Sequence, residues 1–280
     1  MSEADDDDGF TCLAGLLRRS PRILCLVGAG LSAPSGLATW RGTNGLSNDS
    51  YIRSLASPKK FAEDPVIVWN FYGERLLDSL AAQPNAAHHA LAALASWHDG
   101  WLTVNQNVDG LLERTRHPVS RLLDIHGTLQ LVRCTACNYK IYIQTKEDLP
   151  FLDSLSIAAD RSRITLSNLP HCPECGKLLR PGVVWFGERL AAGAPDNIEA
   201  LLEDGIDLVI AAGTSLNVFP AAEWVHKARA DGASVAIIDL DQNHHMVDDL
   251  ETEDLFLNQD ITIVLPEVLN ILQRQWNIPI

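Results

Sequence analysis

An apolar strand that ends in two glycines constrains the fold of this chain more than any other feature. Ile23–Val27 is a nearly continuous apolar run, typical of a strand buried on both faces of a parallel sheet. Gly28 and Gly30 follow directly, and glycine lets the backbone turn sharply there and come close to a ligand. Ser32 can cap the next helix, whose free N–H groups favour a phosphate. A tight strand-to-helix turn without a ligand would give the same short pattern.

Strands and helices alternate along the rest of the chain. Further strands are predicted at residues 101–104, 122–126, 207–213, 234–239 and 261–264, and helices at residues 9–20, 58–80, 86–97, 111–115, 219–229 and 266–275. This alternation predicts an α/β fold with a doubly wound parallel sheet. Such sheets bind ligands at the carboxyl ends of their strands, which here carry residues 28–30, 105–109 and 213–215, His126 and Asp239.

Composition and charge argue against several classes of function. The 280 residues include 22 Lys and Arg against 36 Asp and Glu, a net charge of −14, which disfavours direct binding of nucleic acid. No apolar run reaches the roughly 20 residues of a membrane helix, so we expect no membrane contact. Residues 1–9 lack the features of a leader and are expected to form a disordered acidic tail. We expect an intracellular protein of the cytoplasm or nucleus, with the mitochondrion as the alternative; the oligomeric state stays open, and a monomer is compatible with the sequence.

Four of the six cysteines form two C-x-x-C pairs. Cys134 and Cys137 make the first pair, and Cys172 and Cys175 make the second. Each pair can supply two corners of a tetrahedron around Zn²⁺, and no open coordination position is evident, so we predict one structural zinc site. A redox-active C-x-x-C pair and two unrelated pairs are the alternatives.

The single residues at the strand ends also have ordinary structural explanations. His126 could be a hydrogen-bonded structural histidine, and Asn107 and Asp109 could be turn residues. Asp239 could be an ordinary cap, although an acid after a strand also suits a ribose hydroxyl, as in dinucleotide-binding folds. The function they indicate therefore depends on their combination.

In combination, these residues closely resemble the sirtuin family from about residue 10 to 275. The resemblance is carried by Gly28-Ala-Gly-Leu-Ser32, Asn105-Gln-Asn-Val-Asp109, His126-Gly127, the four paired cysteines, Val183-Val-Trp-Phe-Gly-Glu188 and Gly213-Thr-Ser215. It implies a Rossmann-like domain of residues 10–45, 98–130 and 181–280, and a small inserted domain made of a helical module (46–97) and a zinc-binding module (131–180). It also implies an NAD-dependent protein-lysine deacylase that acts on acylated proteins, consumes NAD and releases nicotinamide and O-acyl-ADP-ribose.

The resemblance further implies roles for individual residues. His126 would be the general base that accepts a ribose hydroxyl proton, with Asn107 and Asp109 as further catalytic residues. Residues 213–215 would meet the adenosine of NAD, and Asp239 its ribose. The whole NAD site would comprise Gly28, Ala29, Gly30, Ser32, Arg41, Gln106, Asn107, Val108, Asp109, Gly213, Thr214, Ser215, Asp239, Asp241 and Ile261. The substrate backbone would pair with a strand formed by Val183, Val184, Trp185, Phe186 and Gly187.

Tyr72 and Arg75 predict which acyl group is removed. They stand three residues apart and would share one face of a helix, where a hydroxyl beside a guanidinium can receive a carboxylate. A core tyrosine beside a solvated arginine is the ordinary explanation. The pair resembles that of the sirtuins that remove succinyl, malonyl and glutaryl groups, and Ala56 resembles a small residue that leaves room for the longer chain. The resemblance therefore predicts a desuccinylase or demalonylase; a deacetylase and a mono-ADP-ribosyltransferase are the alternatives.

Overall fold

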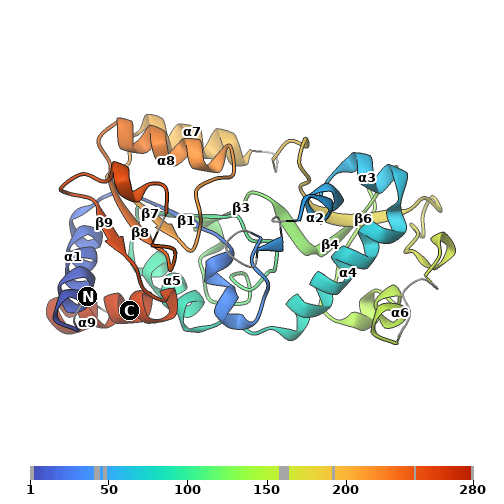
Figure 1. Cartoon of the computed structure of the whole chain (residues 1–280), viewed down its shortest axis with the longest axis horizontal. Coiled ribbons are helices and arrows are strands. Elements are labelled where there is room, and N and C mark those ends of the chain that lie inside the picture. The colour runs from blue at the N-terminus through green and yellow to red at the C-terminus, as the bar shows by residue number, and fades with distance from the viewer. Residues whose placement is uncertain are drawn as a thin grey trace.

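Six strands form one parallel sheet in the computed structural model, which describes residues 3–40, 45–46, 49–157, 164–190, 193–242 and 244–278 (Figure 1). The strand order is β3-β2-β1-β7-β8-β9, and every neighbouring pair is parallel. The predicted cofactor residue Arg41 lies outside the described residues. The strands are β1 (Ile23–Val27), β2 (Trp101–Asn105), β3 (Leu122–Asp124), β7 (Leu208–Ala212), β8 (Ser234–Ile238) and β9 (Leu255–Leu257).

Helices cover both faces of this sheet, as a doubly wound fold requires. The side chains of β1 alternate between the faces: Cys25 packs in the core under α1, α5 and α9, and Leu24 packs in the core under α7 and α8. These two groups of helices lie on opposite sides of the strands in Figure 1. Within the described residues, no helix is both long and apolar enough to cross a membrane. The helices are α1 (Glu3–Arg19), α5 (Ala86–Trp97), α7 (Ala194–Glu203), α8 (Ala221–Ala230) and α9 (Ile261–Trp276).

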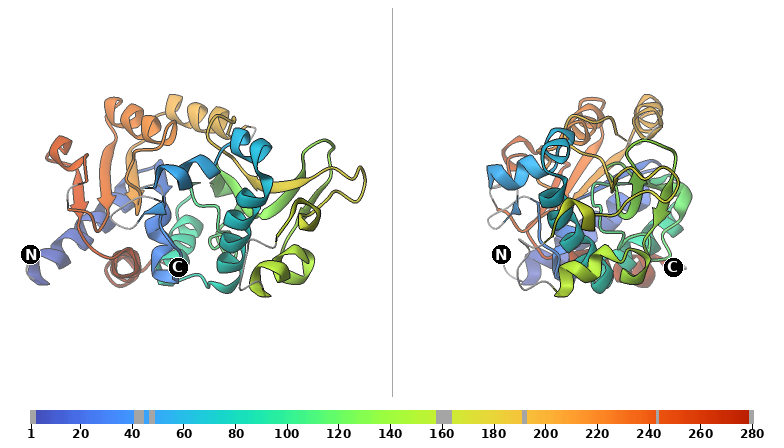
Figure 2. Two further views of the ribbon diagram at one scale, coloured as in Figure 1. Left: turned by 45° about the vertical axis from the view of Figure 1, so that its right-hand side comes forward. Right: turned by 90° about the vertical axis from the view of Figure 1, so that its right-hand side faces the viewer.

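A smaller unit stands beside the parallel sheet and has a core of its own (Figure 2). Trp69, Val132 and Leu152 are fully buried in that core. An antiparallel sheet in the order β5-β4-β6 packs there against α4, and shorter helices flank it. The predicted domain boundaries after residues 130 and 180 fall inside β4 and β6, which pair with each other. The elements are α2 (Ser50–Leu55), α3 (Pro58–Glu63), α4 (Pro65–Ala81), α6 (Phe151–Ile157), β4 (Gly127–Cys134), β5 (Lys140–Tyr142) and β6 (Leu179–Val183).

The two ends of the chain differ from the sequence-based expectation. Helix α1 begins at Glu3, so the acidic residues that were expected to be a disordered tail are helical from there on. Residues 261–264, which were predicted as a strand, are the first turn of α9, because the side chain of Asp260 caps that helix by accepting from the N–H of Thr262 at 2.8 Å. The edge strand beside β8 is β9 instead. Residues 111–116 form turns, not the predicted helix.

The turns that follow β1 and β7 pack backbone against backbone. The N–H of Gly30 donates to the carbonyl of Gly213 at 2.9 Å, and a Cβ on Gly30 would lie 2.6 Å from the Cα of Gly213. A Cβ on Gly28 would meet the Gly213 carbonyl oxygen at 2.7 Å. Glycine at these positions therefore permits contact between two turns, whether or not a ligand approaches.

Replacing Gly213 with alanine should destabilise the fold. Gly213 has φ +60°, and the added methyl group would lie 2.7 Å from the carbonyl carbon of Gly30. We expect a loss of about 3 kcal/mol in the free energy of unfolding measured with urea, because strain and overpacking add. Gly36→Ala is the matched control: φ is +88°, but nothing lies within 4 Å of the added Cβ, so strain alone should cost about 1 kcal/mol. Equal losses in the two variants would contradict close packing of the turns.

Candidate active site

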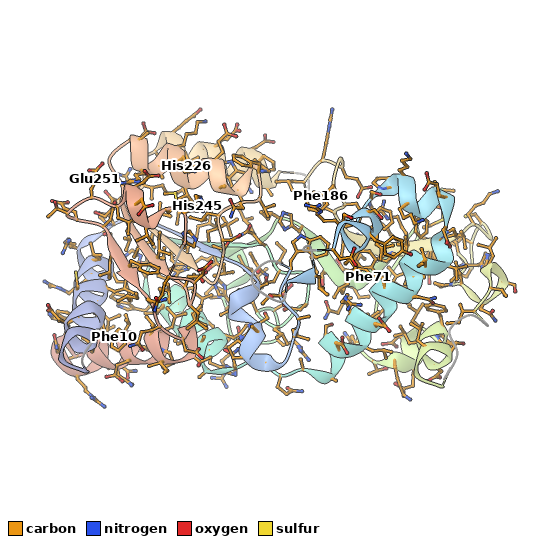
Figure 3. All side chains as sticks on the ribbon, viewed as in Figure 1. Phe10, Phe71, Phe186, His226, His245 and Glu251 are labelled. Carbon is orange, nitrogen blue, oxygen red and sulfur yellow. The ribbon has the colours of Figure 1, made fainter. Side chains whose placement is uncertain are left out.

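A cavity of about 920 Å³ lies where the turns after β1, β2, β7 and β8 meet α4 and the segment after β6. Its volume suits a small molecule or cofactor, for which about 300–1,000 Å³ is usual. Phe71 and Phe186 line it from the side of the smaller unit (Figure 3). Every predicted catalytic, cofactor-binding and substrate-binding residue in the described part lines this cavity: Gly28, Ala29, Gly30, Ser32, Ala56, Tyr72, Arg75, Gln106, Asn107, Val108, Asp109, His126, Val183, Val184, Trp185, Phe186, Gly187, Gly213, Thr214, Ser215, Asp239, Asp241 and Ile261.

His126 has the surroundings of a proton acceptor. It lies between β3 and β4, and its Nδ1 is 2.9 Å from the carbonyl oxygen of Gln106. Burial lowers the pKa of the imidazole below its usual value, so the ring is neutral at neutral pH. A neutral ring whose Nδ1–H donates to a carbonyl keeps Nε2 as its acceptor. The carbonyl of His126 accepts from the N–H of Val184 at 2.7 Å, which connects the predicted base to the segment predicted to bind the substrate backbone.

The end of β2 is held in place by its asparagines. The amide of Asn105 donates to Asp124 on β3 at 2.8 Å, and its oxygen accepts from the N–H of Asn107 at 3.0 Å. The amide of Asn107 then donates to the carbonyl of Gly28 at 2.9 Å. Two of the predicted cofactor-binding turns are therefore joined directly, which explains how residues almost eighty positions apart face one cavity.

A network of buried polar groups lies behind these turns. Asp109 accepts from the N–H of Leu111 at 2.9 Å and from the hydroxyl of Ser32, but burial outweighs both bonds and raises its pKa. The hydroxyl oxygen of Ser32 is 3.4 Å from Nε2 of His88. The N–H of Asn85 donates to Nδ1 of His88 at 3.2 Å, so Nε2 carries the ring proton and donates to Ser32. Burial lowers the pKa of His88 to about 4, which keeps the ring neutral.

Tyr72 and Arg75 both line the cavity from α4. Tyr72 is buried, and burial raises the pKa of its hydroxyl, which is therefore protonated. Nη1 of Arg75 donates to the carbonyl of Phe71 at 2.8 Å and to Glu74 at 3.2 Å. Its Nε is buried and has no hydrogen-bond partner within the described part of the chain. Ala56, 6% exposed, lies against the same cavity.

The segment after β6 is folded by its own hydrogen bonds. Glu188 bonds to both terminal nitrogens of Arg180, at 2.6 and 2.9 Å, and accepts from the N–H of Trp185 at 2.9 Å. The guanidinium of Arg180 lies 3.5 Å from the ring centroid of Trp185. The N–H groups of Val184 and Phe186 also donate within the chain. Pairing of this segment with a substrate peptide stays a prediction, and it would rely on carbonyl oxygens more than on these N–H groups.

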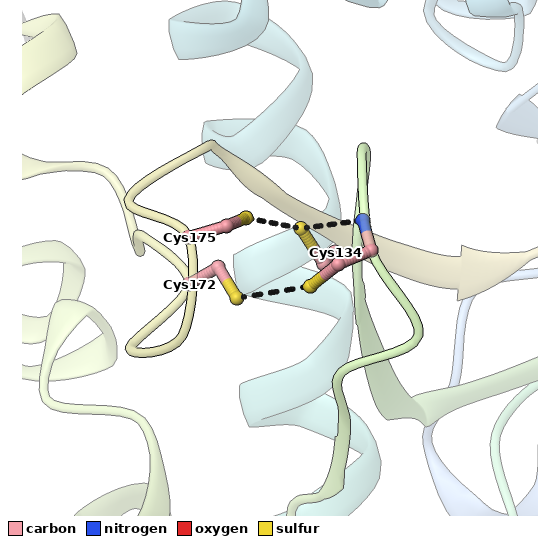
Figure 4. Close-up of side chains that lie close together, drawn as sticks. Cys134, Cys172 and Cys175 are labelled. Atoms are coloured by element: carbon pink, nitrogen blue, oxygen red, sulfur yellow. Dashed lines mark hydrogen bonds between the residues drawn. The ribbon is translucent and has the colours of Figure 1, made fainter.

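The four paired cysteines lie together away from this cavity, in the smaller unit (Figure 4). Their sulfur atoms are all within 4.8 Å of one another, and the Cys134–Cys175 and Cys137–Cys172 sulfurs are 3.4 and 3.5 Å apart. A tetrahedral Zn²⁺ with Zn–S bonds of about 2.3 Å would set these distances near 3.8 Å, so the cluster fits zinc. None of the four lines the cavity, which suits a structural metal.

Comparison with known proteins identifies the family. The Sir2 family model matches residues 28–220. A protein of Candida albicans named NAD-dependent protein deacylase is 36% identical over 91% of this chain and 95% of its own length. A protein of Pyrococcus abyssi with the same name is 35% identical over 94% of this chain and 97% of its own. The chain belongs to the Sir2 family.

Solved Sir2 structures share the fold of this Sir2-family chain. A mutant Sir2 homologue in complex with ADP-ribose aligns with a TM-score of 0.80 over 100% of both chains, at 32% identity. A complex of a Sir2 homologue with NAD aligns with a TM-score of 0.77 over 94% of this chain and 93% of its own, at 33% identity. The resemblance to sirtuins and the predicted Rossmann-like fold are therefore confirmed. The names of these relatives do not tell whether the chain belongs to the desuccinylase group or to the deacetylases.

Two histidines of this Sir2-family chain that lie in or next to the cavity were not predicted from the sequence. His88 lies behind Ser32, and His244 lines the cavity itself. His88 falls within an alanine- and leucine-rich helix and carries no local signal of a role. His244 follows Asp239 and Asp241 in the loop after β8, and only that neighbourhood could have indicated it.

The imidazole of His126 should titrate below its ordinary pKa of about 6.5. Burial disfavours the charged ring, so the neutral, proton-accepting form should persist as the pH falls below 6.5 and be lost only as the pH falls through the lowered pKa. The measurement is an NMR pH titration of the ring resonances, assigned by comparison with His126→Asn. A midpoint above 6.5 would contradict the neutral base.

Loss of one cysteine ligand should remove the metal and loosen the smaller unit. Cys172 and Cys134 are buried in that unit's core, so Cys172→Ser should lower the zinc content, measured by elemental analysis, from about one ion per chain to near zero, and lower the melting temperature. Cys12→Ser, at an exposed cysteine outside the cluster, should change neither value. A metal-free wild-type protein would contradict the zinc site.

Proposed function

We propose that this Sir2-family chain is an NAD-dependent protein-lysine deacylase that prefers succinyl, malonyl or glutaryl groups, which end in a carboxylate. The general activity is supported by its relatives, because the Candida and Pyrococcus proteins that carry this name match over 95% and 97% of their own lengths. A further Sir2 structure, 26% identical to this chain, is bound to an acetylated peptide, which supports acylated peptides as substrates. The preference for an acidic acyl group rests on the cavity of this chain.

The cavity has residues suited to both halves of NAD, the adenosine half and the nicotinamide half at which the reaction takes place. Asp239 lines it directly after β8, where a carboxylate can accept hydrogen bonds from ribose hydroxyls. The neutral His126 lines the same space, so its Nε2 can accept a proton from a ribose hydroxyl. When bound, NAD would supply a ribose carbon that the acyl oxygen can attack as nicotinamide leaves. The network of Asn107, Ser32 and Asp109 would hold the turns that surround this ribose.

The unpartnered Nε of Arg75 is the observation that carries the acyl preference. A buried guanidinium N–H without a partner costs free energy, and an acyl carboxylate toward which the Arg75 guanidinium turns would satisfy it. The hydroxyl of Tyr72 is neutral and able to donate to the same carboxylate, since the two residues share one face of α4. Ala56 adds little volume at this end, so a chain longer than acetyl has room.

Glu74 is the observation that favours plain deacetylation as the second candidate. It lies 3.2 Å from Nη1 of Arg75 and already offsets part of the positive charge. An acidic acyl group would have to share the guanidinium with this carboxylate. The contact occupies Nη1 and leaves Nε without a partner, which is why we favour the acidic acyl group.

Arg75→Met should separate the two activities. Loss of a charge-assisted hydrogen bond should lower kcat/KM for a succinyl-lysine peptide by about 10- to 100-fold, and kcat/KM for the matching acetyl-lysine peptide by less than about threefold. Tyr72→Phe removes only the hydroxyl and should have a smaller effect in the same direction. The measurement is the initial rate of nicotinamide release at saturating NAD.

Arg53→Met provides the matched control. It removes the same charge from an exposed position on α2 that does not line the cavity, and should leave both peptides unaffected. An equal loss of both activities in Arg75→Met, with an unchanged melting temperature, would contradict the role of Arg75 in acyl recognition. Equal activity of the wild-type protein on both peptides, unaltered by the substitution, would favour the deacetylase.

A further inference from the structure

His244 is a buried histidine at the edge of the main cavity. It lies in the loop after β8, its side chain is 5% exposed, and it contributes to the cavity lining. Its neighbour His245 stacks on it with ring centroids 5.1 Å apart, but is exposed and does not line the cavity. Two adjacent histidines therefore have different surroundings, and only the first faces the predicted cofactor site.

Both ring nitrogens of His244 have partners. The N–H of Met246 donates to Nδ1 at 3.3 Å, so the ring accepts at that atom. Nε2 therefore carries the proton and donates to the carbonyl oxygen of Thr214 at 3.0 Å. A single tautomer satisfies both bonds, and the ring is fixed between its own loop and the turn after β7.

Thr214 contacts two of the other turns that surround the cavity. Its hydroxyl accepts from the side-chain amide of Gln106 at 2.9 Å. A Cβ added to Gly28 would lie only 2.7 Å from the Cβ of Thr214 and 3.0 Å from its Cα, so Thr214 packs directly against the turn after β1. The bond from His244 therefore acts on a residue that already contacts the turns after β1 and β2.

The loop that holds His244 also contains the predicted ribose acid. The N–H of Asp241 donates to the carboxylate of Asp239 at 2.9 Å, and the N–H of His244 donates to the carbonyl of Asp241 at 3.1 Å. His244 thus joins two segments by hydrogen bonds: residues 213–215 after β7 and residues 239–241 after β8. From these segments, the sirtuin resemblance assigns residues 213–215 and Asp239 to the adenosine half of NAD.

We propose that His244 is a positioning residue of the cofactor site, which holds residues 213–215 and 239–241 in the relative arrangement that the adenosine half of NAD requires. This inference rests on the proposed use of NAD. His244 is not a catalytic residue, since it bonds to neither His126 nor the acyl end of the cavity. Gln106, whose carbonyl is hydrogen-bonded to His126, is held independently by the bond from its N–H to the carbonyl of Val27 at 3.0 Å.

His244→Ala should weaken cofactor binding without slowing the chemical step. The variant leaves the buried carbonyl of Thr214 without this donor, so we expect the Kd for ADP-ribose, measured by calorimetry, and the KM for NAD to rise about tenfold. Because the base and its partner stay in place, kcat at saturating NAD and the KM for the acyl peptide should change less than about twofold. His245→Ala is the matched control and should behave as the wild type.

His244→Gln separates positioning from general stability. The side-chain amide of Gln can donate to the carbonyl of Thr214, so this variant should recover most of the affinity for ADP-ribose even if His244→Ala is poorly folded. An unchanged Kd in folded His244→Ala would overturn the role of His244 alone. Equal losses in kcat and in affinity in both variants would also overturn it, because they indicate general destabilisation. A wild-type protein that binds ADP-ribose poorly and consumes no NAD would overturn the proposed function as well.

Discussion

The packing of two glycine turns is the constraint on which the site depends. Gly28 and Gly30 can lie against Gly213 only because none of them carries a side chain. This contact brings the turn after β1 to the turn after β7, almost two hundred residues further along the chain. The side-chain amide of Asn107, just after β2, also donates to the carbonyl of Gly28 and so holds the end of β2 against the turn after β1. The glycines that predicted a sharp turn and a close approach to a ligand are therefore needed first for the contact between two turns that line the cavity.

Burial sets the protonation states of two histidines near these turns. His126 and His88 are both neutral because burial disfavours their charged forms, yet their hydrogen bonds differ. His126 donates from Nδ1 to a backbone carbonyl and keeps Nε2 as an acceptor, whereas His88 accepts at Nδ1 and donates from Nε2 to Ser32. One ring can thus take a proton from a substrate, and the other supports the polar network of Asp109. The same physical effect leaves one ring with a free acceptor nitrogen, as the proposed base requires, and makes the other ring a structural donor.

Local patterns in the sequence were sufficient for the parallel sheet, the cysteine cluster and the polar residues at the strand ends, whereas the substrate side of the cavity was predicted only through the sirtuin resemblance. Apolar runs identify buried strands, and polar residues at their carboxyl ends must meet at one edge of the sheet. The start of α9 was misread because Ile261 and its neighbours are β-branched, while the deciding signal was the single cap of Asp260. His88 and His244 were missed because their partners, Ser32 and Thr214, are 56 and 30 positions away. Contacts of this kind depend on the completed fold, which no local pattern encodes.

The two candidate activities, removal of acidic acyl groups and removal of acetyl groups, are distinguished by the acyl group that the protein removes fastest. The most direct measurement exposes matched acetyl-, malonyl-, succinyl- and glutaryl-lysine peptides to the wild-type protein with and without NAD, and follows each by mass spectrometry. We expect the acidic acyl peptides to be consumed with the higher kcat/KM, only when NAD is present, with one nicotinamide released for each acyl group removed. Faster removal of acetyl than of any acidic acyl group would contradict the carboxylate receptor that we propose Tyr72 and Arg75 to form.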